Sequence, residues 1–496
     1  MKKFLTVLTV ALAAVAARAA LPQPDLIAQI HFAGVQKIAA DKNYSAFTNE
    51  FSSAEALALR KQTADKLAPW LAGWLQAKLG VSVPDGAVKL RPLLDDLQRA
   101  EWFLEARAAV GGKPEVALAI RQDECHAELW QAGLKAFFPA AVFKSSGGWL
   151  IFDSGTGAQK LGDSLAQKIS TPSSGWLSVD VNWPRLAEWY PVLNQLELPE
   201  TLFEVAVADA NLSITGKFFF PENLSLKLEA WQFPTNTVHQ PIVSFTAVRG
   251  FAQWLNGQDW AQSFKISPAA NQLFVWALNG MPLQTFAAVP VPNPESAMRQ
   301  LYAGLQPVVA DRNEHDGFLS AFTLVFTNNQ LSLLHVPLLS PNIKALKEPA
   351  GQFLFAGGFP NSPKNKPLPP ELLQRLTTKD LVLYHWEITS ERMPSQLQMS
   401  QLGLLITRHK QLDGKSAAFE WVQKIAPTFG YTYTEIVQSA PDQLMLTRKA
   451  PGGLTAFELL TLADWLEATN FPHCDLKLPP PSERFKKLRA NNPAPK

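Results

Sequence analysis

The first candidate for chemistry in this sequence is the carboxylate of Asp153, in the stretch WLIFDSGTGAQKLGDSLAQKI that begins at residue 149. An apolar run leads into Asp153-Ser154-Gly155, and a helical pattern follows it. Two carboxylates held close together share one proton, and their pKa values separate, which suits them to acid–base catalysis. A catalytic role for Asp153 therefore requires a second acidic residue beside it.

The Asp-Ser-Gly triplet resembles the catalytic triplet of aspartic proteases, but the likeness covers only this loop and no second triplet occurs. The corresponding loop later in the chain, VPLLSPN at residues 336–342, contains no acidic residue. We expect Ser340 to cap a helix there and Pro341 to begin it. We interpret the Asp153 loop in the same way, as a turn that begins a helix.

Two histidines form a second pair of candidates, because each ends an apolar strand-like stretch and precedes an aromatic residue: His31-Phe32 and His385-Trp386. Histidine transfers protons near neutral pH, and equivalent positions in repeated units can face each other. The alternative is that each imidazole is a packed strand residue with a single hydrogen bond.

Cys125 and Cys474 are the two cysteines of the chain, and a disulfide between them is possible in an oxidising compartment. His126 and His473 lie next to them, but neither pair has the close spacing of a zinc site, so we expect no metal.

We also expect no cofactor, because each cofactor-like motif is incomplete. The segment 409–416 ends like a phosphate-binding loop but has His409 in place of its first glycine, and the segment 311–317 has its glycine one position too late for calcium.

Alternating apolar residues predict strands that the chain repeats, each followed by a helical stretch. These strands are residues 27–32, 177–182, 243–248 and 381–386. Hairpins are expected between them, one of which turns at Asn279-Gly280. The sequence therefore predicts an α+β fold of two similar halves, produced by internal duplication, in which antiparallel hairpins alternate with helices.

Four segments follow from this pattern: a signal peptide at 1–19, a first half at 20–238, a second half at 239–478 and a disordered, basic, Pro-rich tail at 479–496. The first segment has Lys2 and Lys3, an apolar run and small residues around Ala19. We therefore expect cleavage after Ala19 and a periplasmic or secreted protein.

Composition limits the kinds of partner that we expect the protein to bind. With 47% hydrophobic residues and only two cysteines, a large core must stabilise the fold. The mature body has no basic stripe, so nucleic acid is not expected, and no apolar run after the first segment is long enough to span a bilayer. The tail could contact an anionic surface weakly. The 15 tryptophans and 30 phenylalanines fill a core or line a groove for a glycan, an apolar ligand or a partner chain; Trp70 and Trp74 are four apart on a predicted helix.

Three stretches, HFAGVQKIAADKN at 31–43, QTADKL at 62–67 and NQLFVWALNGMPLQTF at 271–286, resemble a group of large exported proteins of unassigned function from environmental Gram-negative bacteria. This resemblance implies export and transfers no activity. Because every catalytic motif is incomplete, we expect an exported cell-envelope binding or scaffolding protein rather than an enzyme. The alternative is a hydrolase of envelope polymers whose carboxylates come from distant segments.

Overall fold

The computed structural model describes most of the chain between residues 25 and 473. The described residues are 25–41, 51–108, 114–154, 161–170, 175–190, 193, 198–258, 267–278, 284–315, 322–327, 329–336, 339–359, 367–368, 370–408 and 414–473. The predicted signal peptide, the predicted tail and Cys474 lie outside these residues.

Within the described residues, eighteen strands form one hydrogen-bonded sheet. The strands are β1 Leu26–Phe32, β2 Trp102–Ala108, β3 Pro114–Arg121, β4 Val142–Ser146, β5 Trp149–Asp153, β6 Leu177–Val181, β7 Glu200–Ala208, β8 Asn211–Phe219, β9 Ile242–Arg249, β10 Gln272–Leu278, β11 Thr285–Pro290, β12 Thr323–Thr327, β13 Gln330–Leu334, β14 Asn342–Glu348, β15 Gly351–Gly357, β16 Leu381–Ile388, β17 Tyr431–Ala440 and β18 Gln443–Ala450. Every pairing is antiparallel, and the strands lie side by side in the order β4-β5-β3-β2-β1-β6-β7-β8-β18-β17-β16-β9-β10-β11-β15-β14-β13-β12.

The predicted α+β fold, in which antiparallel hairpins alternate with helices, is wrong, because the described strands form one large antiparallel sheet that is richer in strands than predicted. The pair β8–β18 joins the early and late strands in register from Leu212↔Ala450 to Phe219↔Gln443. An unpaired strand edge leaves backbone donors and acceptors exposed, and this pairing satisfies the inner edges of both groups of strands.

The helix predicted after Ser340 is also wrong, since Asn342–Glu348 is strand β14, paired with β13 and β15. Ile343 and Ala345, two residues apart, lie on the same face of this strand and pack against the cluster that contains Met298 and Leu354. Pairing with β13 and β15, together with this packing on one face, therefore decides the local structure, and the Ser-Pro pair precedes a strand.

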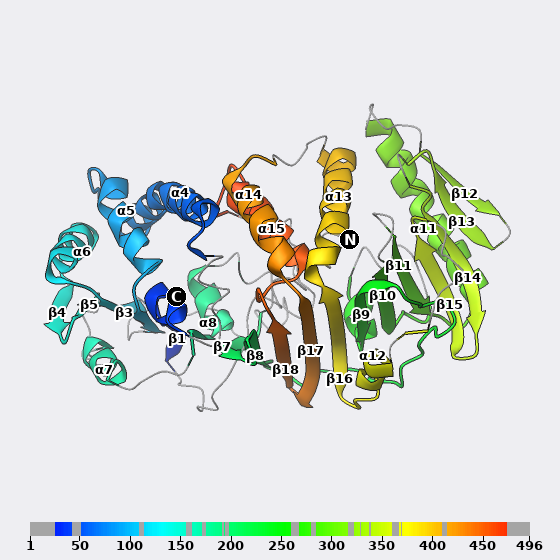
Figure 1. Cartoon of the computed structure of the whole chain (residues 1–496), viewed down its shortest axis with the longest axis horizontal. Coiled ribbons are helices and arrows are strands. Elements are labelled where there is room, and N and C mark those ends of the chain that lie inside the picture. The colour runs from blue at the N-terminus through cyan, green and yellow to red at the C-terminus, as the bar shows by residue number, and fades with distance from the viewer. Residues whose placement is uncertain are drawn as a thin grey trace.

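The helices are α2 Val35–Ala39, α4 Ala54–Leu79, α5 Gly86–Leu97, α6 Glu124–Phe137, α7 Leu161–Lys168, α8 Trp183–Trp189, α9 Ala252–Asn256, α11 Pro294–His315, α12 Pro370–Arg375, α13 Thr389–Arg408, α14 Ala417–Ile425 and α15 Ala456–Glu467. Most of the long helices, α4, α5, α11 and α13–α15, lie along one side of the elongated sheet (Figure 1). The short helix α7 packs on the other face, against Ala117 and Ala119, whereas Leu118 and Ile120 face the cluster that α4–α6 cover. The alternation of these four residues shows how one strand serves both layers.

Local sequence signals begin several of these helices. Thr455 and Glu458 form a reciprocal capping box at the start of α15. Helix α4 begins after Ser53, whose side chain accepts the Ala56 amide, and it continues through Pro69 as a single helix of 26 residues. Packing on both sides of Pro69, through Ala64, Ala68 and Ala72, keeps the helix whole.

The largest buried cluster among the described residues is rich in aromatic side chains. Phe274, Trp276, Phe286 and Phe353 are almost fully buried between β9, β10, β11 and β15. Among the described residues, no helix has the length and apolar character needed to cross a bilayer.

Candidate functional site

His31 lies on β1 and is buried. Its ring stacks on Phe103, with centroids 4.0 Å apart, and its Nε2 lies 3.2 Å from Oε1 of Glu101. Hydrogen bonding from His31 and the charges of Lys37 and Arg121 outweigh the effect of burial and lower the pKa of Glu101. The structure thus places His31 in a packed strand position with an ion-pair network around its carboxylate partner.

His385 lies on β16, where it belongs to a row of polar side chains that contact one another. Its Nδ1 lies 2.8 Å from the Thr246 hydroxyl oxygen, and its Nε2 lies 3.5 Å from Oε2 of Glu387. The buried Glu387 carboxylate also accepts hydrogen bonds from the Thr389 hydroxyl and from the Ala456 amide at the start of α15. These contacts and His385 outweigh burial and lower the pKa of Glu387. The row connects β9, β16 and α15 through polar contacts.

The two histidines do not face each other. Strands β6, β7, β8, β18 and β17 lie between β1 and β16. At about 4.8 Å per strand, this arrangement separates His31 from His385 by roughly 29 Å. A site shared by the two imidazoles is therefore not formed.

Asp153 lies at the end of β5. Its Oδ2 accepts a hydrogen bond from the Gly162 amide, 2.8 Å away, in the first turn of α7. Ser154 bridges to β3, since its hydroxyl donates to the Val116 carbonyl and accepts from the Val116 amide. The contact to α7 is one that stabilises a helix start.

Cys125 is exposed on α6. Its predicted partner Cys474 lies outside the described residues, so the predicted disulfide stays a prediction. Within the part of the chain that the structure describes, no group of three or more His, Cys, Asp or Glu residues is arranged to hold a metal ion.

The ring faces of Trp70 and Trp74 are occupied by neighbouring aromatic groups. The two indoles stack with centroids 6.3 Å apart, and Tyr190 stacks on Trp74 at 5.8 Å. The Trp70 indole donates a hydrogen bond to His473. These rings pack α4 against neighbouring segments.

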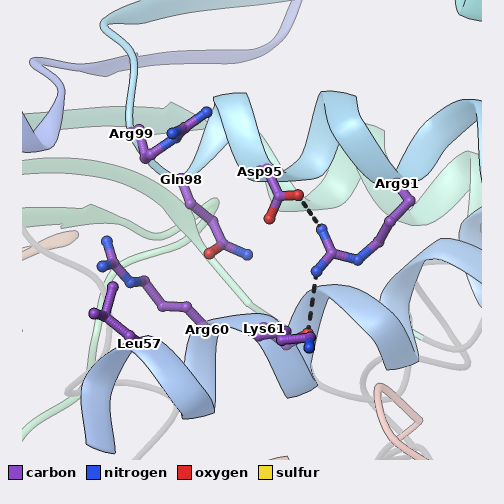
Figure 2. Close-up of a pocket in the computed structure, with 7 residues that line it drawn as sticks. All are labelled: Leu57, Arg60, Lys61, Arg91, Asp95, Gln98 and Arg99. Carbon is purple, nitrogen blue, oxygen red and sulfur yellow. Dashed lines mark hydrogen bonds and ion pairs between the residues drawn. The ribbon is translucent and has the colours of Figure 1, made fainter. Parts of the chain in front are cut away.

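A hollow of about 380 Å³ lies between α4 and α5 (Figure 2). On one wall α4 carries Leu57, Arg60 and Lys61; on the other, α5 carries Arg91 and Asp95 and is followed by Gln98 and Arg99. Four of the lining side chains are cationic and one is acidic. This excess of positive charge makes the hollow attractive to an anion.

Packing fixes the two walls. Leu75 on α4 and Leu90 and Leu93 on α5 belong to the same buried cluster. Below α5, the buried Asp96 accepts hydrogen bonds from the indole of Trp130 and lies 3.2 Å from Nδ1 of His126. The lining side chains therefore project from two helices that pack against each other.

The cations of the hollow differ in their pairing. Arg91 is held by Asp65, by Asp95 and by the Lys61 carbonyl. Arg99 pairs with Asp96 at 3.0 Å. By contrast, Arg60 makes no hydrogen bond or ion pair with any residue in the described ranges. Partial burial lowers the pKa of its guanidinium, the charge of Arg99 lowers it further, and the charge of Asp95 offsets these effects only in part. Arg60 is thus a half-buried cation that makes no direct contact with a counter-charge in the described ranges.

An acidic pair lies elsewhere, on β6 and β7. Burial raises the pKa of Asp180 to about 6, and the charge of Glu200 adds to the shift, while Lys168 opposes it. Glu200 accepts a hydrogen bond from Asn182, and burial raises its pKa as well. Asp180 can therefore hold a proton near neutral pH, as a general acid does.

The sequence did not single out the residues of the hollow. The spacing of Arg91 and Asp95, four apart on a predicted helix, is a signal for an ion pair and not for a site. The chain matches no protein-family model, no curated protein and no solved structure.

Proposed function

We propose that this chain is an exported cell-envelope binding protein that holds an anionic ligand between α4 and α5. The observation that carries the proposal is the hollow with its unpaired Arg60. A guanidinium removed from water loses hydration, and a bound anion restores the missing hydrogen bonds. Export follows from the predicted signal peptide.

The volume of the hollow supports this role, because ligand sites of small molecules or polymer segments begin at about 300 Å³. The packed helices support it too, since a site formed before binding costs less ordering entropy. Scaffolding does not require an unmatched guanidinium, so binding is the better of the two roles.

Binding of the mature chain to dextran sulfate, with neutral dextran as the matched control, tests the proposal. We expect binding to the sulfated polymer that weakens as salt rises, because added ions screen the arginines. Fractionation of producing cells tests export, and the mature chain should be found outside the cytoplasm. Failure of the full-length mature chain to bind any anion would overturn the proposal.

A hydrolase of envelope polymers is the second candidate, and the raised pKa of Asp180 beside Glu200 favours it. The neighbouring Lys168 is already paired with Glu105 and with Gln29. Incubation of the protein with isolated cell-wall polysaccharide, followed by measurement of reducing ends, tests this activity. The D180N variant should lose any activity that depends on this acid.

A further inference from the structure

We propose that Arg60 and Arg99, on opposite walls of the hollow, bind the phosphoryl group of a phosphate ester whose apolar substituent rests on Leu57. This inference rests on the proposed binding function and names the class of ligand.

The choice of a phosphoryl group comes from the number and placement of donors. One guanidinium satisfies a planar carboxylate with a bidentate pair of hydrogen bonds. Arg60, Arg99 and Lys61 line the same hollow, and together their cationic groups carry more donors than two carboxylate oxygens can accept. The three terminal oxygens of a phosphate ester can accept from both walls at once.

Arg91, the remaining cationic residue of the hollow, has a structural role and does not contact the ligand. Asp65, Asp95 and the Lys61 carbonyl occupy its donors, so it links α4 to α5 and sets the width of the hollow. Arg91 is therefore a positioning residue, whereas Arg60 and Arg99 contact the ligand.

Leu57 and Gln98 indicate which groups the ligand carries besides its phosphoryl group. Leu57 is 51% exposed and lines the hollow one helical turn before Arg60 and Lys61, where it offers an apolar contact. The amide of Gln98 lines the other wall and can donate to the ester oxygen or to a hydroxyl. An ester with a short apolar group fits these neighbours better than inorganic phosphate does.

Phosphate esters reach an envelope protein either as soluble compounds or as lipid headgroups, and the two sources share this chemistry. Phenyl phosphate represents the soluble source. Vesicles of phosphatidylcholine with phosphatidylglycerol represent the lipid source, and vesicles of phosphatidylcholine alone are their control.

Isothermal titration of the full mature chain tests the proposal. We expect phenyl phosphate to bind more tightly than inorganic phosphate, and benzoate to bind at least about tenfold more weakly than phenyl phosphate. R60Q and R99Q should each weaken the binding of phenyl phosphate about tenfold or more. R60K should lose less affinity, because lysine keeps the positive charge. L57S should reduce the preference for phenyl phosphate over inorganic phosphate.

The matched control is R375Q, since Arg375 is 53% exposed and lies on α12, where it pairs with Glu435. This variant should bind phenyl phosphate as the parent does. Circular dichroism of each variant confirms that the fold is kept. Binding that R375Q weakens as much as R60Q does would show a general charge effect and overturn the two-arginine site.

These measurements distinguish failure of the phosphoryl inference from failure of the proposed function. Binding of dextran sulfate without binding of phenyl phosphate or of phosphatidylglycerol vesicles would retain the proposed function and reject the phosphoryl ligand. Loss of both kinds of binding would reject both proposals. Binding to phosphatidylglycerol vesicles without binding to phenyl phosphate would support the phosphoryl site with a lipid source.

Discussion

Two arginines of this protein differ in their pairing, and the difference separates a structural role from the binding role that we propose. Arg448 on β18 is 1% exposed and directs both Nη atoms to the carboxylate of Glu458, at 2.8 and 2.9 Å. Its Nε donates to Thr434, and Nη1 also donates to the Gly453 carbonyl. Arg60, in contrast, is half-buried and has no such partner in the described ranges. A saturated arginine joins elements, and an unsaturated arginine is available to a ligand.

The positions of the two arginines explain the difference. Glu458 closes the capping box of α15, so Arg448 ties the start of that helix to the sheet. Arg60 lines the hollow between α4 and α5, where we propose that a phosphate ester binds. Burial with full pairing makes an arginine costly to remove, and partial burial without pairing makes it cheap to remove.

The largest expected effect is on the buried pair. E458Q leaves the Arg448 guanidinium buried without its counter-charge, and we expect it to reduce the free energy of unfolding by about 3–5 kcal/mol. Urea unfolding followed by tryptophan fluorescence measures the change. The double variant R448M/E458M should recover part of the loss, since it removes both charges but also the capping contact of Glu458 and the Arg448 hydrogen bonds to Thr434 and Gly453. If E458Q lowered the free energy of unfolding by less than about 1 kcal/mol, Arg448 would not differ from Arg60 in its importance for stability.

A smaller effect on the free energy of unfolding is expected from Asp180, a carboxylate close to the negative charge of Glu200. Its pKa in the folded protein is about 6, above the ordinary value of 3.8, so the folded state holds a proton that the unfolded state releases. The free energy of unfolding should therefore fall as pH rises from about 4 to about 6, by about 1 kcal/mol because solvent screens a partly exposed group.

Urea titrations at several pH values measure this slope for the parent and for D180N. The variant should lose the part of the slope that Asp180 contributes, because a neutral amide does not titrate, whereas Glu200, whose pKa burial also raises, continues to titrate. An equal slope in both proteins would assign the pH dependence to other groups.

The smallest effect on stability is expected at Arg60. R60Q removes a cation that Arg99 repels, so we expect the melting temperature to stay within a few degrees of the parent and to rise slightly at low salt. Differential scanning calorimetry measures it, with R375Q as control. A large destabilisation by R60Q would make Arg60 a structural residue like Arg448.

The sequence predicts individual strands and hairpins better than it predicts how they join. The alternating segments at 27–32, 177–182, 243–248 and 381–386 are strands β1, β6, β9 and β16. Their periodicity is a local property, and it suffices to identify each strand. The β8–β18 pair unites distant segments, and no local pattern specifies which strand edges will meet.

The candidate residues show the same limit. His31 and His385 have similar neighbours in sequence, but the sheet order separates them by five strands. The hollow depends on the angle and contact of α4 and α5, which bring Arg60 near Arg99 from separate helices. Residue types alone do not indicate which arginine will lack a partner; this depends on which carboxylates the folded helices place nearby.

The β8–β18 junction also has a consequence for synthesis. During translation β8 emerges long before β18, and its outer edge has no neighbour until the late segment arrives. Contacts between such distant positions slow folding, and an open edge in the meantime can recruit other chains. Nascent or shortened chains that lack β18 should therefore depend on a holding chaperone, and they should aggregate through β8 when none is present.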